Sequence, residues 1–224
     1  MTKLNDIVIW SGTLIILISF LLASFVSRTY CTRPYMKLFF LYPLISLVIS
    51  INTIFNRIFY LYSYETGFFI QFLLLILDLI FWSFLFTTIL KNTIDSKNIK
   101  TIFYITSLFI ISLLFFSTLS NSNLHVISLI NLCKTIFCIF YYRRLLKNLP
   151  TQNLILEPSF WIVAGVFFYS CLSIPLYALH DYIKLNFTLI ISKNIFIISN
   201  IFIVVMHLFF IKAYICTTRL PKVS

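Results

Sequence analysis

Two charged residues lie near the middle of long apolar segments of the chain. Asp78 stands in the segment QFLLLILDLIFW and Lys134 stands in NLCKTIFC. An ionisable side chain among apolar residues is costly to bury, so it usually has a partner and often has a function. The two residues lie at matching depths in their segments, so they could form a buried ion pair, although the sequence does not show that they face each other. Such a pair either holds two helices in register or takes part in a proton or ion relay, and the sequence leaves both interpretations open.

A polar stripe marks the last apolar segment. In KNIFIISNIFIVVMH, Lys193, Asn200 and His207 recur at every seventh position, which places them on one face of a helix. Because the rest of this helix consists of Ile, Phe and Val, we expect the stripe to face other helices. There it either forms hydrogen bonds between helices or lines a polar cavity. Together with Asp78 and Lys134, these three residues form a predicted interior polar site.

No residue pattern in the sequence predicts an enzyme, a cofactor or a metal site. The chain has no HExxH, GxSxG or Gly-rich phosphate-binding motif, and no apolar segment carries paired carboxylates. Its five cysteines include no CxxC and no Cys/His pair at metal-binding spacing. We therefore expect a protein that is not an enzyme and that has no catalytic residues, no cofactor and no metal.

The composition places these segments in a membrane. Hydrophobic residues make up 61% of the 224 residues and charged residues 10%, against about 45–50% and about 25% in soluble domains. A membrane-spanning helix needs about 20 mainly apolar residues. The segments that meet this requirement are 7–27, 37–55, 67–90, 101–119, 124–142, 159–181 and 187–212. We predict an all-α fold, a single transmembrane domain over residues 1–224 that is a bundle of seven helices joined by short loops.

The distribution of Lys and Arg predicts how the bundle is oriented. In inner-membrane proteins these residues gather in the cytoplasmic loops. Here they concentrate after the first, third and fifth spans and at the C-terminus, whereas the other loops and the N-terminus hold only Lys3, Arg57 and Lys184. We therefore predict an inner-membrane protein with its N-terminus outside and its C-terminus in the cytoplasm.

A basic cytoplasmic face follows from this orientation. It accounts for the net charge of +11 without any direct binding of nucleic acid, and it would attract membrane lipid of negative charge or an acidic protein partner. The candidate residues of this surface are Arg28, Arg33, Lys97, Lys100, Arg143, Arg144 and Lys147.

One run of the sequence resembles a known group of proteins. The run NLPTQNLILEPSFWIVAGVFFYSCLSIPLYAL contains Phe160, Trp161, Gly165 and Tyr169. It is similar to the signature of small seven-span membrane proteins of Bacteroidetes-type bacteria. The stretches LYSYETGFFIQFLLL and ISNIFIVVMHLFF resemble the same family more loosely. Because such relatives stand alone or precede a histidine kinase, the resemblance implies a role in sensing or regulation.

The size, the number of spans and the composition are also similar to those of a second group. This is the membrane accessory protein encoded beside the RNA-guided RNase of type VI-B CRISPR systems, which is associated with repression of interference. We therefore expect a regulatory or accessory protein that modulates a cytoplasmic partner, most concretely this RNase in antiviral defence. The alternative is a small-molecule sensor, receptor or transporter that uses the interior polar site. The sequence does not indicate the oligomeric state.

Overall fold

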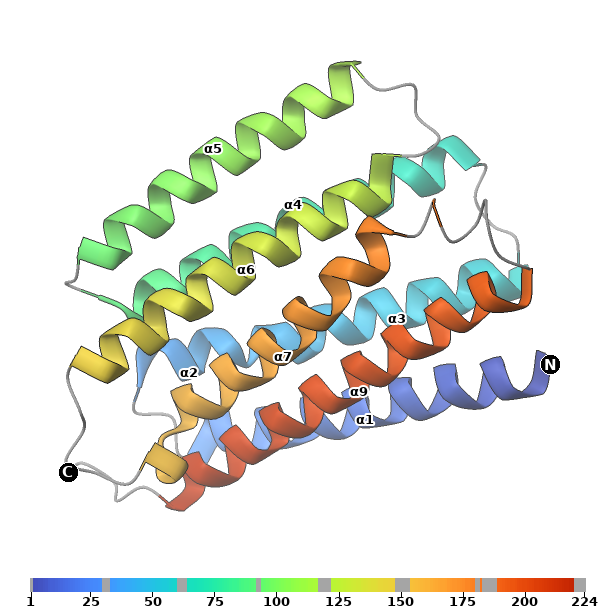
Figure 1. Ribbon diagram of the computed structural model, residues 1–224. Helices are drawn as coiled ribbons and strands as arrows, with labels where there is room; N and C mark the ends of the chain where they lie inside the picture. The colour runs from blue at the N-terminus through green and yellow to red at the C-terminus, as the bar shows by residue number, and fades with distance from the viewer. Residues whose placement is uncertain are drawn as a thin grey trace.

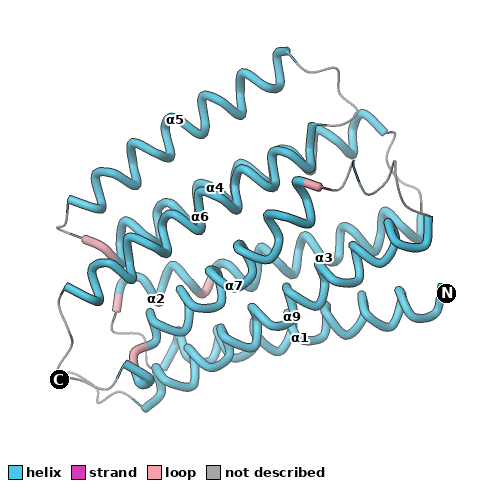
Figure 2. Tube along the Cα trace, viewed as in Figure 1, coloured by secondary structure: helices cyan, strands magenta, loops and turns pink. Residues whose placement is uncertain are grey.

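The computed structural model describes residues 2–29, 33–59, 64–91, 94–116, 122–147, 154–179, 182 and 189–219. Its α-helices are α1 (Thr2–Thr29), α2 (Pro34–Phe39), α3 (Leu41–Phe59), α4 (Tyr64–Ile89), α5 (Ile94–Phe116), α6 (Ser122–Lys147), α7 (Pro158–Ala178) and α9 (Leu189–Arg219). All but α2 are long. A short 3-10 helix, η1 (Leu154–Leu156), precedes α7. The described part of the chain contains no strand, so the predicted all-α class is confirmed there (Figure 2).

The long helices lie side by side and reverse direction from one to the next (Figure 1). Helix α9 packs between α1 and α7, and α7 packs in turn against α6. Helix α4 contacts α5 and α6, and α2 contacts both α3 and α4. The ends of the helices that carry most of the Lys and Arg residues therefore meet at one end of the bundle.

Five helices are long and apolar enough to cross a membrane. Their apolar stretches are Trp10–Ser27, Pro34–Ile51, His125–Lys147, Pro158–Ala178 and Ile197–Arg219. The described part of α4 contributes a shorter apolar stretch, Leu73–Ile89. These stretches overlap six of the predicted spans, although the last, Ile197–Arg219, is shifted toward the C-terminus from the predicted 187–212. The fold is that of a helical membrane protein.

The outer surface of the bundle is apolar, as contact with lipid requires. On α1, the side chains of Leu14, Leu21 and Phe25 are 58%, 58% and 60% exposed. A face of this kind has no counterpart on an ordinary soluble monomer. In a bilayer it contacts acyl chains, which are as apolar as the side chains themselves.

Aromatic rings fill the core where α2, α3, α4 and α9 meet. The ring centroids of Tyr42 and Trp82 are 4.7 Å apart, and those of Phe39 and Phe210 are 4.8 Å apart. Phe39, Trp82 and Phe210 are fully buried. Burial of such large side chains fixes how these four helices sit against one another.

Gly165 allows the closest approach between α7 and α9. A Cβ atom at this position would lie 2.8 Å from Cβ of Phe209 and 3.2 Å from the carbonyl oxygen of Met206. Both atoms belong to or adjoin the backbone of α9, so they have little room to move. The absence of a side chain at Gly165 is what lets the two helices pack at this distance.

Candidate functional site

The interior polar site is centred on an ion pair between α4 and α6. The ammonium group of Lys134 contacts the carboxylate of Asp78, and their side chains are 5% and 18% exposed. Trp82, one helical turn beyond Asp78, donates its Nε1–H to Oδ1 of the same carboxylate at 3.0 Å. The ion pair between Asp78 and Lys134, which the sequence left open, is therefore present.

Aromatic side chains from three helices enclose this pair. Nζ of Lys134 lies 5.8 Å from the centroid of the Trp82 ring and 6.0 Å from that of Tyr169 on α7. Tyr42 of α3 packs against Trp82. A cation is attracted to the faces of aromatic rings at these distances, so the ammonium group is stabilised by its surroundings as well as by Asp78.

His207 reaches the same region from α9. Its imidazole is fully buried, and its ring lies 6.2 Å from that of Tyr42 and 5.3 Å from that of Phe210. Neither ring nitrogen of His207 has a hydrogen-bond partner among the described residues. Among the described residues, aromatic rings connect the imidazole to the ion pair: His207 contacts Tyr42 and Phe210, and both of these contact Trp82.

Asn131 adds a second unsatisfied group to the centre of the bundle. It lies one turn before Lys134 on α6 and is 2% exposed. Its Nδ2 atom has no hydrogen-bond partner in the part of the chain that the structure describes, and the same holds for the hydroxyls of Ser170 and Ser173 on α7. Polar groups without partners thus collect on α6, α7 and α9.

The two other residues of the predicted stripe are described less fully. Asn200 is half-buried on α9. The backbone of Lys193 belongs to α9, but its side chain lies outside the described residues. The structure therefore brings together Asp78, Lys134 and His207.

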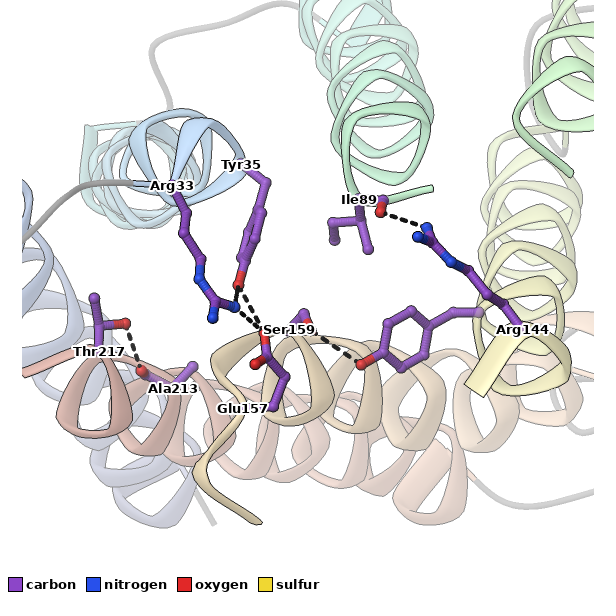
Figure 3. A network of polar contacts seen from close by, with 9 residues as sticks. Arg33, Tyr35, Ile89, Arg144, Glu157, Ser159, Ala213 and Thr217 are labelled. Carbon is purple, nitrogen blue, oxygen red and sulfur yellow. Dashed lines mark hydrogen bonds and ion pairs between the residues drawn. The ribbon is translucent and has the colours of Figure 1, made fainter. Parts of the chain in front are cut away.

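A second polar network ties the basic end of the bundle together (Figure 3). The guanidinium group of Arg33 forms an ion pair with Oε1 of Glu157, which stands directly before α7. The same carboxylate oxygen accepts hydrogen bonds from the hydroxyls of Tyr35 at 3.1 Å and Ser159 at 3.2 Å. The hydroxyl of Ser159 also contacts that of Tyr141 on α6 at 3.0 Å. Glu157 therefore links the start of α2 to α7 and, through Ser159, to α6.

The charge of Arg33 is retained in this network. Burial disfavours the charged guanidinium, but Tyr35 and Glu157 outweigh burial and raise the pKa of Arg33 above its ordinary value. Arg33 therefore serves a contact within the protein.

Arg144 also has an internal partner. Its Nη1 donates a hydrogen bond at 3.0 Å to the carbonyl oxygen of Ile89, the last residue of α4 (Figure 3). The last carbonyls of a helix lack partners within the helix, and a basic side chain is a favourable donor to them. Arg144 thus caps α4 and ties it to α6.

The other predicted surface residues remain available. Lys97 and Lys100 on α5 and Arg143 and Lys147 on α6 are exposed, and none of the four forms an ion pair within the described residues. The side chain of Arg28 lies outside the described residues. These four side chains, Lys97, Lys100, Arg143 and Lys147, form the basic surface of the bundle.

Comparison of the chain with family models, with curated proteins and with solved structures finds no match. Within the described residues, no three His, Cys, Asp or Glu side chains are grouped closely enough to hold a metal ion. Fold and sites define a helical membrane protein with a charged, aromatic-lined centre and a basic end.

Proposed function

We propose that the chain is a non-enzymatic regulatory or accessory protein of the inner membrane that acts on a cytoplasmic partner. In this proposal the bundle has seven spans, with the N-terminus outside and the C-terminus in the cytoplasm. The observation that carries it is the basic surface, whose cations are exposed and form no ion pair with the residues that the structure describes. Arg33 and Arg144, by contrast, are used to hold helices together.

The spacing of the basic residues suits contact with an acidic protein surface. Arg143 and Lys147 lie one turn apart on α6, and Lys97 and Lys100 lie one turn apart on α5. Each pair therefore presents two cations on the same side of its helix. At physiological ionic strength such charges act over about 8 Å, so they favour a partner that comes into direct contact with this end of the bundle.

The first partner to test is the RNA-guided RNase of type VI-B systems, which the resemblance in size and composition suggests. The chain is co-expressed with the RNase in a reporter strain. CRISPR interference is measured with the wild type and with a variant carrying Arg143→Glu and Lys147→Glu. The wild type should repress interference and the variant should not, at equal amounts of protein in the membrane.

Two results would count against this proposal, each in a different way. If the wild type leaves interference unchanged, this RNase is not the partner. If the charge-reversed variant represses as well as the wild type, the basic surface is not the contact. The matched control is Lys37→Glu, an exposed cation on α2 that lies outside the two pairs.

A second candidate function is a small-molecule sensor or transporter that uses the interior polar site. The observation that favours it is that the ring nitrogens of His207 and the Nδ2 atom of Asn131 are buried without hydrogen-bond partners among the described residues. A double variant, Asp78→Asn with Lys134→Met, tests it. If that variant folds and retains full activity, the interior is structural and this candidate is excluded.

A further inference from the structure

Asn131 and His207 are unusual among the buried polar groups of the bundle. Both lie in helices that cross the apolar layer, and within the described part of the protein the Nδ2 atom of Asn131 and both ring nitrogens of His207 lack hydrogen-bond partners. An unsatisfied polar group in such surroundings is costly. A fold that retains two of them in its centre therefore supplies their hydrogen bonds in some other way.

The unpartnered serines nearby do not raise the same problem. A Ser hydroxyl in a helix can rotate and donate to the carbonyl group one turn earlier, as Ser24, Thr106 and Ser107 do in this protein. The side-chain amide of Asn131 and the imidazole ring of His207 do not satisfy all their polar atoms with a backbone carbonyl of their own helix in this way. Asn131 has two donors and an acceptor, and a neutral His207 has one donor and one acceptor.

Both groups lie at the level of the ion pair. Helices α6 and α7 run antiparallel, with Ser128 opposite the carbonyl of Ile174 and Tyr141 opposite Ser159. This register places Lys134 close to Tyr169, as their contact confirms.

Helix α9 follows the same register against α7. Tyr177 contacts Ser199, and Gly165 adjoins Met206. His207 therefore also lies near the level of Tyr169. Asn131 and Lys134, three positions apart on α6, share one face of that helix.

We propose that the centre of the bundle is a hydrated site in which bound water bridges Asn131 and His207 to the polar groups around the Asp78–Lys134 pair. A buried water molecule needs two to four polar partners, and this layer offers the amide, the imidazole, the carboxylate and the hydroxyls of Ser170 and Ser173. The proposal does not depend on the cytoplasmic partner. Its consequence is that water reaches the charged pair in the middle of the membrane.

Water contact at His207 can be measured directly, because the chain has only three histidines. The full chain is labelled with 15N-histidine and reconstituted in phosphatidylcholine liposomes. Magic-angle-spinning NMR then measures the transfer of magnetisation from water to the imidazole nitrogens. The signals of His207 are assigned by their loss in His207→Phe.

We expect the nitrogens of His207 to receive water magnetisation at a rate within a few-fold of that of the exposed His125. Asn131→Leu should slow the transfer to His207, because it removes one partner of the bridging water. Leu132→Ala, next to Asn131 but facing lipid, should leave it unchanged. Transfer to His207 at least tenfold slower than to His125 in the wild type would overturn the proposal.

Thermal stability gives an independent result. If Asn131 is bridged by water, Asn131→Leu removes a satisfied group and lowers the melting temperature. If the site is dry, the same change removes an unsatisfied group and raises the melting temperature. An unchanged or higher melting temperature in Asn131→Leu therefore also counts against a hydrated site.

Discussion

Removal of one member of the Asp78–Lys134 pair should destabilise the bundle far more than removal of both. In Lys134→Met the carboxylate of Asp78 keeps, among the described residues, only the hydrogen bond from Trp82. In Asp78→Asn the ammonium group of Lys134, whose side chain is 5% exposed, keeps only the faces of two aromatic rings. Breaking a buried pair in this way costs about 3–5 kcal/mol, whereas replacing both partners is often close to neutral.

The free energy that each single variant loses cannot exceed the cost of neutralising the charged group that is left without its partner. An ordinary aspartate, with a pKa of about 3.9, takes up a proton at pH 7 for about 4 kcal/mol. An ordinary lysine, with a pKa of about 10.4, loses one at pH 7 for about 5 kcal/mol. We therefore expect each single variant to cost about 3–4 kcal/mol and the double variant about 1 kcal/mol.

The measurement is unfolding in mixed micelles of dodecyl maltoside and SDS, followed by tryptophan fluorescence, because Trp82 adjoins the pair. Each variant is compared with the wild type at the same pH. Lys100→Met, which removes an exposed lysine, is the control and should cost nothing measurable. The interpretation of the pair as a coupled unit is refuted if the costs of the two single variants simply add up in the double variant.

Three further predictions concern packing and the basic end. Gly165→Ala should lower the free energy of unfolding by about 1–3 kcal/mol, because its Cβ would overlap α9. In the same SDS titration Gly12→Ala should be neutral or stabilising, because its Cβ would lie 3.8 Å from its nearest neighbour. Arg144→Gln should cost about 1.5–3 kcal/mol through loss of its bond to the end of α4, while Arg143→Gln, exposed on the same helix, should leave the unfolding midpoint within error. Glu157→Gln should cost no more than about 1 kcal/mol, since its ion pair is about one-third exposed. A larger loss of stability in thermal melts would show that this network holds the helices together more strongly than its exposure implies.

The parts of the structure that the sequence could predict are those marked by a pattern of residues within one segment. Long apolar segments indicate helices wherever they occur, and charged residues within them indicate depth. The sequence therefore identified Asp78 and Lys134 as candidates for an ion pair, but that they face each other could only be seen in the structure. Helix α5 shows the limit of this signal: it begins at Ile94, before the predicted span at 101, because an apolar window does not register the polar first turns of a helix.

The surroundings of the pair depend on contacts between distant segments and were not predicted. Trp82 lies one turn after Asp78 and could have been proposed as its donor from spacing alone. The enclosure by Tyr42 and Tyr169 depends on how α3 and α7 pack against α4 and α6, which no local pattern encodes. A count of basic residues likewise treats Arg143 and Arg144 alike, although only Arg144 meets the free carbonyl at the end of α4.

The ion pair also places a condition on how the protein is made. Asp78 precedes its partner by 56 residues, so α4 leaves the ribosome well before α6. A carboxylate that enters the bilayer alone is unfavourable, and α4 gains its counter-ion only when α6 arrives. Insertion of α4 together with α6 would therefore spare α4 the cost of an unpaired carboxylate in the bilayer.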